Sequence, residues 1–182
     1  PNWDEVATKS TFESVTTFQS SNVFFDPLSV VPETREKGIS HRGYPRHLNE
    51  EVQRNIEVQA NQRIRMTPDV VAMLWNGDWD VDAYTRIENE ARGSLTVENP
   101  FTSNSMSPFN SQNTVLTRAA AKHFFMFPFI GRFDDIVASY YVQSLGFEVL
   151  YTKPTVVQVR NVHSLQKDLE AEQWGYQNIR SE

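Results

Sequence analysis

The sequence predicts a single α/β domain over residues 1–182, and three observations support that class. Strand-like apolar runs such as DVVAMLWNGD (69–78) alternate with helix-like segments such as DDIVASYYVQSLGF (134–147), an alternation typical of α/β folds. Hydrophobic residues make up 39% of the chain and aromatic residues 12%, which suits a globular core. The sequence also shows no internal repeat.

The first half of the chain is expected to contain two helices and two strands around a long loop. Prolines and glycines mark the loop, and loops of this length in compact domains are usually functional or disordered. In order, we expect a weak helix and a Ser/Thr-rich connection in 1–20, a short buried strand at 22–25, the loop at 26–51, a buried strand at 69–78 and a helix at 80–92.

The helix expected at 80–92 has signals at both ends. Asp80 can cap its first turn and Gly93 can end it. Three apolar residues recur at a helical period and fall on one face, namely Val81, Tyr84 and Ile87.

The second half is expected to continue the alternation. Gly146 is positioned to close one helix. The predicted elements are a strand at 113–117, a short helix at 118–125, a helix at 134–147, paired strands at 148–161 and a final helix at 164–176.

Composition excludes several functions. The net charge is −6 and no stripe of Lys and Arg is present, so nucleic acid is not an expected partner. The chain has no cysteine, which removes disulfides, thiolate nucleophiles and zinc–thiolate sites. The longest apolar runs fall far short of the roughly 20 residues that cross a bilayer, so we expect no membrane segment in this chain.

The adjacent carboxylates of Asp134 and Asp135 form the first candidate site. At a helix start, one carboxylate can cap free backbone N–H groups and meet the positive end of the helix dipole. Only one side chain of such a pair caps well, so the other could act as a general base in a cleft. The sequence leaves both interpretations open.

Three aspartates, Asp78, Asp80 and Asp82, form the second candidate site, directly after a strand. Hard cations such as Mg²⁺ or Mn²⁺ prefer several carboxylate oxygens, and a strand end can present them together. Turn formation and capping explain the same pattern.

Two further groups are polar. One is a dense run of hydrogen-bonding side chains suited to the hydroxyls of a sugar or nucleoside, although a polar turn has the same composition; it comprises Asn110, Ser111, Gln112 and Asn113. The other follows a predicted strand and comprises Arg160, Asn161 and His163. There, the arginine could pair with a phosphate and the histidine could bind a metal, or the histidine could serve only in capping or packing.

Taken in order, five motifs resemble the later part of the STELLO-like glycosyltransferase-related family. They span about residues 40–170 and read RGYP, WNGDWDVDAYTRI, SPFNSQNTVLT, RFDDIVASYY and PTVVQVRNVHSLQKDL. The resemblance implies a GT-A type fold, a Rossmann-like α/β sheet that binds a nucleotide-sugar donor and commonly a Mn²⁺ or Mg²⁺ ion. It also implies a Golgi lumen location for a eukaryotic member and a cytoplasmic one otherwise.

The resemblance further implies roles for particular residues. Asp135 would be the catalytic base in transfer to an acceptor hydroxyl, with Asp134 as the second candidate, and His163 would contact the metal. The substrate-binding residues would be Arg42, Gly43, Tyr44, Asp78, Asp80, Asp82, Asn110, Ser111, Gln112, Asn113, Arg132, Arg160 and Asn161. Arg46 is a further candidate for diphosphate or acceptor contact, although Arg42 and Arg46 could equally be solvated surface residues.

The sequence also departs from the family pattern. The family's main metal-binding aspartates would lie upstream of Pro1, in the first nucleotide-binding part of the domain. We therefore expect that this part is lacking or separate, or that the aspartates at 78–82 have taken over the metal. A sheet edge left uncovered in this way favours a partner, either an N-terminal fragment or a second copy in a homo-oligomer.

Three functions remain open from the sequence. The first is a nucleotide-sugar-dependent, metal-assisted glycosyltransferase, which acts on a glycan or another hydroxyl acceptor. The second is a non-catalytic relative that keeps the fold as an interaction or scaffold module. The third is a glycoside hydrolase, which needs two carboxyl groups about 5–9.5 Å apart; adjacent aspartates on a helix point in different directions, which disfavours it.

Overall fold

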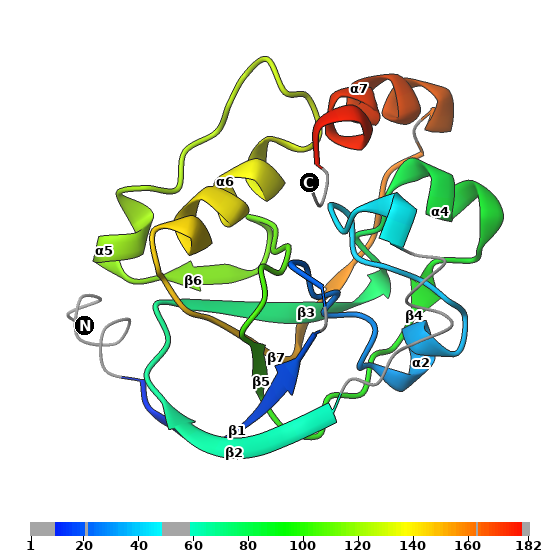
Figure 1. The fold of residues 1–182 in the computed structure, drawn as a ribbon. Coiled ribbons are helices and arrows are strands. Elements are labelled where there is room, and N and C mark those ends of the chain that lie inside the picture. Colours follow the sequence, from blue (N-terminus) through cyan, green and yellow to red (C-terminus); the bar gives the residue numbers. More distant parts are fainter. Residues whose placement is uncertain (1–9, 21, 49–58, 163, 180–182) are drawn as a thin grey trace.

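A mixed β-sheet forms the centre of the protein, and several helices lie against it (Figure 1). The structure, a computed structural model, describes residues 10–20, 22–48, 59–162 and 164–179. Within these ranges seven strands form one open sheet. The α/β class predicted from the sequence is confirmed at this level.

The sheet has the strand order β2-β1-β5-β7-β3-β4, and β6 also pairs with β3. Two neighbouring pairs are parallel, β1 with β5 and β3 with β7, while the other pairs are antiparallel. The strands are β1 (Phe12–Gln19), β2 (Gln59–Met66), β3 (Val70–Asp78), β4 (Arg92–Gly93), β5 (Phe101–Ser103), β6 (Thr114–Leu116) and β7 (Val149–Gln158).

The helices are mostly short, and the two longest come late in the chain. They are α2 (Pro32–Arg35), α4 (Ala83–Glu88), α5 (Arg118–Ala121), α6 (Asp134–Ser144) and α7 (Leu165–Asn178). No helix in the described part of the chain is long and apolar enough to span a membrane.

Strand β7 connects two parts of the core because its side chains alternate between the faces of the sheet. Leu150 packs with Val15 of β1 and Met66 of β2. Val149 and Tyr151 face the larger core cluster, which also includes buried residues of β3 and β5. Burial on both faces therefore fixes β7 in the middle of the sheet.

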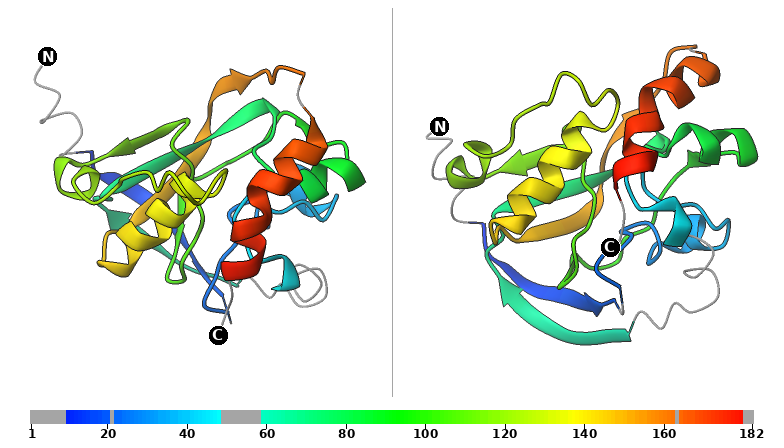
Figure 2. Two further views of the ribbon diagram at one scale, coloured as in Figure 1. Left: turned by 90° about the horizontal axis from the view of Figure 1, so that it is seen from above. Right: turned by 45° about the horizontal axis from the view of Figure 1, so that its top comes forward.

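Helices α6 and α7 pack against each other on the upper side of the sheet, as the two views of Figure 2 show. Phe133 and Ile136 at the start of α6 contact Trp174 and Tyr176 of α7. Ser164 caps α7 by accepting from the N–H of Lys167. These contacts place the first turn of α6 between the sheet and α7.

The predictions for α6 and α7 are confirmed. Helix α6 ends before Gly146, whose φ of 89° is the left-handed conformation common just past a helix end. The strands expected at 69–78 and 113–117 are β3 and β6, and the short helix expected at 118–125 forms over Arg118–Ala121.

Two predictions near the ends of the chain are wrong. Residues 12–19, expected to belong to a weak helix and a Ser/Thr-rich connection in 1–20, form β1, and residues 1–9 lie outside the described residues. Its Val, Thr and Phe side chains suit a strand, and pairing with the distant β2 decides the outcome. The segment expected as paired strands at 148–161 is the single strand β7, which continues through Pro154 where its pairing with β3 is irregular. A proline without an N–H fits such an interruption.

Other boundaries also differ. At 22–25 the structure has only an isolated bridge from Phe24 to Met106 instead of a strand. Helix α4 is shorter than predicted, because Asp82 rather than Asp80 caps it and Gly93 lies in β4. Tyr84 and Ile87 of the expected apolar face are exposed.

Candidate functional site

The carboxyl ends of the parallel strands β3 and β7 bring charged residues together. Asp78 ends β3 and Asp80 follows two residues later, while Arg160 lies just past the end of β7. The backbone N–H of Arg160 donates to Asp78 Oδ2 at 2.8 Å. Its guanidinium Nη2 donates to Asp80 Oδ1 at 2.7 Å. The pairing of two strands from distant parts of the chain thus forms this contact.

Arg42, from the long loop, connects the strand ends to α6. Its Nη2 lies 3.0 Å from Asp80 Oδ2, and its Nη1 lies 3.1 Å from Asp135 Oδ1. Nη1 also donates to the backbone carbonyl of Arg132. One guanidinium therefore bridges two carboxylates from different elements, a geometry that the planar fork of arginine favours.

Two polar residues of the 110–113 run complete the arrangement. Asn110 Nδ2 donates to Asp80 Oδ2 at 2.7 Å. The backbone N–H of Ser111 donates to Asp135 Oδ2 at 3.1 Å. We call this group the Arg42 cluster; its members are Arg42, Asp80, Asn110, Ser111, Asp135 and Arg160.

Gly43 allows the loop to approach α6 closely. Its φ is 100°, and a Cβ at this position would overlap the side chain of Ile136. The Tyr140 hydroxyl donates to the Gly43 carbonyl at 3.0 Å. Only glycine accepts both this backbone conformation and this distance, so Gly43 helps to position Arg42.

The centre of the Arg42 cluster is buried, with exposed fractions of 5% for Arg42, 0% for Asp80 and 5% for Asp135. Burial alone would raise the pKa of Asp80, but the Arg42 guanidinium outweighs it and holds that pKa well below its usual range. Burial likewise disfavours the charged form of Arg42, but Asp80 and Asp135 raise its pKa. Asp80 and Arg42 are therefore both ionised at neutral pH.

Further ion pairs surround the cluster. Arg46 Nη1 lies 3.3 Å from Asp82 Oδ1, and the same oxygen caps α4 by accepting from the Thr85 N–H at 2.7 Å. Arg132 pairs with Asp168 and lies 3.2 Å from Glu172, both on α7. The Arg46 pair therefore attaches the long loop to the start of α4, and the Arg132 pairs attach the start of α6 to α7.

Asp134 lies beside the cluster. Its Oδ1 accepts from the backbone N–H of Asp135 at 2.8 Å, and its side chain is half-buried. The two adjacent carboxylates therefore face different surroundings, since one meets its own helix start and the other meets Arg42.

The remaining predicted residues are not members of the cluster, although the Gln112 N–H donates to Asn110 Oδ1 at 3.0 Å. Tyr44 packs in a small apolar group with Phe24 and Leu48. Asn113 Nδ2 donates to the Leu74 carbonyl at 3.1 Å. Gln112 and Asn161 are exposed. The predicted metal ligand His163 lies outside the described residues.

The three aspartates after β3 do not fit a metal ion in this arrangement. Asp80 accepts from Arg42, Arg160 and Asn110, while Asp82 caps α4 and pairs with Arg46. Asp78 accepts from the N–H of Arg160. Across the ranges that the structure describes, no group of three or more His, Cys, Asp or Glu side chains could hold a metal.

Sequence reasoning missed three residues near the cluster. Arg86 of α4 donates through Nη2 to the Trp79 carbonyl. Glu172 is fully buried and accepts from the Ala83 N–H at 2.8 Å. His41, next to Arg42, is also buried. Arg86 stands in the motif that contains Asp80 and Asp82, a signal that could have drawn attention to it; a buried glutamate in an otherwise polar helix gives no such signal.

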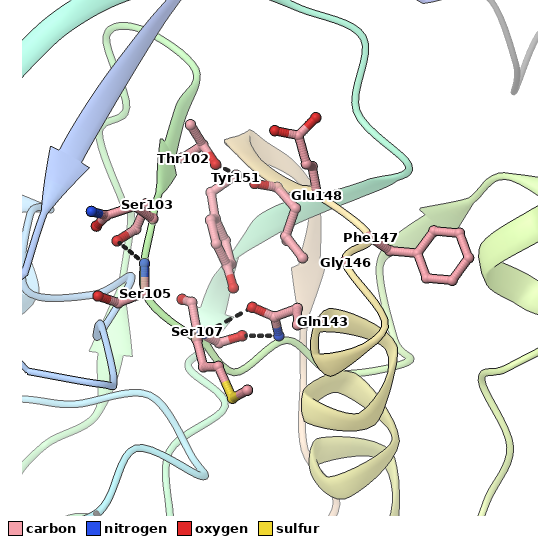
Figure 3. Close-up of a pocket in the computed structure, with 12 residues that line it drawn as sticks. Thr102, Ser103, Ser105, Ser107, Gln143, Gly146, Phe147, Glu148 and Tyr151 are labelled. Atoms are coloured by element: carbon pink, nitrogen blue, oxygen red, sulfur yellow. Dashed lines mark hydrogen bonds between the residues drawn. The ribbon is translucent and has the colours of Figure 1, made fainter.

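Two cavities lie away from the Arg42 cluster. One, of about 340 Å³, lies between the loop after β5 and the end of α6 and is lined by Thr102, Ser103, Asn104, Ser105, Met106, Ser107, Gln143, Gly146, Phe147, Glu148, Val149 and Tyr151. In Figure 3 the side chain of Gln143 exchanges two hydrogen bonds with the backbone of Ser107. The other, of about 310 Å³, lies beside β1 and Pro32. Neither is lined by a residue predicted for the site.

No protein-family model matches the chain, and no curated protein matches it either. The STELLO-like resemblance therefore remains a prediction from the five motifs.

Proposed function

We propose that the chain is a glycosyltransferase domain that uses a nucleotide-sugar donor, with the GT-A type fold that the resemblance implies. One observation carries the proposal: residues of five separate motifs meet in the Arg42 cluster at the carboxyl ends of β3 and β7. In open α/β sheets, ligands bind outside this end of the strands. Arginines gathered at this edge also suit an anionic diphosphate.

The reaction would join the acceptor oxygen to the anomeric carbon of the donor sugar. The bond from that carbon to the diphosphate breaks, and the acceptor proton passes to a carboxylate. Both oxygens of Asp135 accept from Arg42, so its role is to hold that guanidinium. Asp134 is half-buried, and among the described residues its Oδ1 accepts only from the N–H at its own helix start. We therefore assign the proton to Asp134, with Asp135 as its positioning neighbour.

Calorimetric titration of the chain with UDP and GDP tests the proposal. Each titration is run with Mn²⁺ and again with EDTA, because the resemblance implies a metal ion that His163 contacts. UMP is the matched control ligand, since it lacks the second phosphate. We expect UDP or GDP to bind at least 10-fold more tightly than the monophosphate. If neither diphosphate binds with Mn²⁺ or with EDTA, the proposal is wrong.

A second function, a non-catalytic interaction module, is favoured by a different observation. The central carboxylates of the Arg42 cluster are buried and matched by guanidinium groups, an arrangement that also serves structure alone. Such a module would bind no diphosphate. Changing Asp134 to Asn would alter neither its stability nor its binding to a partner. The same titrations therefore separate the two functions.

A further inference from the structure

Arg160, a member of the Arg42 cluster, and the nearby Arg86 each have an N–H donor without an acceptor among the described residues. The Nε atoms of Arg86 and Arg160 are buried and have no hydrogen-bond partner among the described residues. Each guanidinium has five N–H donors, and leaving such a donor buried without an acceptor is costly. Bound water or a ligand commonly explains such groups.

These two arginines also act on each other. Arg86 Nη2 donates to the carbonyl of Trp79, and Arg160 Nη2 donates to the carboxylate of the next residue, Asp80. The two guanidinium groups therefore lie near each other. Burial and the positive charge of Arg160 together lower the pKa of Arg86 to about 10, and Asp80 and Asp78 offset only part of this effect. An anion between them would relieve the repulsion and accept from both Nε atoms.

The neighbouring aspartates do not hold a metal ion that would bind such an anion in place of the arginines. Their oxygens accept from arginines, Asn110 and backbone N–H groups, as described above. A divalent ion would have to displace these donors before it could bridge to a phosphate. The guanidinium groups of Arg86 and Arg160 can bind a phosphate without displacing these donors from the aspartates.

We propose that Arg86 and Arg160 bind the phosphate groups of an anionic ligand directly, in place of the metal ion that the resemblance implies. The chemical class is a diphosphate, either free pyrophosphate or the diphosphate of a nucleotide. This inference rests on the proposed function for the identity of the nucleotide, but the anion site itself is tested separately.

The test is calorimetric titration of the full chain with inorganic pyrophosphate and with UDP, in EDTA. Arg86→Lys keeps the positive charge but lacks Nε and the planar fork, and Arg86→Gln removes the charge. Arg35→Gln is the matched control, because Arg35 is an exposed arginine on α2. Thermal unfolding of each variant checks that it is folded before titration.

We expect pyrophosphate to bind in EDTA, and we expect Arg86→Gln to weaken binding at least 10-fold. Arg86→Lys should weaken it several-fold, and Arg35→Gln should leave it unchanged. Equal binding by wild type and folded Arg86→Lys and Arg86→Gln variants would overturn the inference. Binding of pyrophosphate or UDP that requires Mn²⁺ would also overturn the inference, but it would leave the glycosyltransferase proposal standing.

The remaining outcomes also separate the two proposals. Pyrophosphate binding that depends on Arg86, with no tighter binding of UDP or GDP than of UMP, would support the anion site and contradict the transferase. Absence of binding by pyrophosphate and by both nucleotides, with and without Mn²⁺, would overturn both.

Discussion

Arg42 depends on two carboxylates for its burial, so each of them should matter to stability. Replacing Asp135 by Asn removes one negative charge from a buried guanidinium. Breaking a buried pair in this way is strongly destabilising, and we expect a loss of about 3 kcal/mol in the free energy of unfolding. Urea unfolding at neutral pH measures it.

Asp134→Asn is the matched control for that change. Asp134 is half-buried and its Oδ1 accepts from the helix start, so the expected loss is below about 1 kcal/mol. Equal losses at the two positions would contradict the interpretation that Asp135 anchors Arg42. If the Asp135→Asn variant were stable but bound no diphosphate, the result would instead favour a direct role for Asp135 in diphosphate binding.

Asp26 should make stability depend on pH. Burial raises its pKa to about 6, although N–H groups of His41 and Leu28 and the Ser40 side chain lower it. The folded state therefore holds this proton more tightly than the unfolded state does. Between about pH 4 and pH 6 the folded state binds more protons, so this contribution to stability falls as the pH rises.

The variant Asp26→Asn isolates that contribution. The free energy of unfolding of the wild type should fall relative to the variant by about 2 kcal/mol between pH 4 and pH 7. Denaturant unfolding of both proteins across this range measures the difference. A difference that does not change with pH, or that changes in the opposite direction, would show that Asp26 does not titrate in this way.

Among the elements, those with local signals were predictable from the sequence. Helix α6 begins with two acidic residues and ends before Gly146, and α7 follows a capping serine. Strand β3 has a continuous apolar run. The sequence of β1 lacks such a signal, because only Val15 is fully buried and its partner β2 is mostly polar. Pairing between distant segments cannot be seen in a local window.

The contact between α6 and α7 gives a prediction at this scale. A Cβ added at Gly175 of α7 would overlap the ring of Phe133. The overlap should outweigh the gain in helix propensity of about 1 kcal/mol, so we expect Gly175→Ala to destabilise the protein by about 1–3 kcal/mol. Thermal or urea unfolding measures this change.

Gln173→Ala is the control in the same helix, because Gln173 is exposed. It should be neutral or slightly stabilising, since alanine favours helices. If Gly175→Ala were as stable as Gln173→Ala, then Phe133 would have room to move, and the packing of α7 on α6 would be looser than described.

At the scale of the whole molecule, the sequence indicated which motifs matter but not how they combine. Arg42, Asp80, Asn110, Asp135 and Arg160 were all predicted for the site, and they do meet. Their partners could not be predicted, because the order β5-β7-β3 and the path of the long loop determine them. The alternative in which the aspartates at 78–82 hold the metal needs free carboxylate oxygens, whereas the fold supplies arginines and a backbone N–H to these oxygens.

The bonds of Arg42 have a consequence for the order in which the chain can fold during synthesis. Asp80 lies 38 residues after Arg42, and Asp135 lies 93 residues after it. Because ribosomes release the N-terminal part first, Arg42 must stay hydrated until both carboxylates have emerged. A chain stalled before α6 would keep its early loop in water, where proteases and chaperones can reach it.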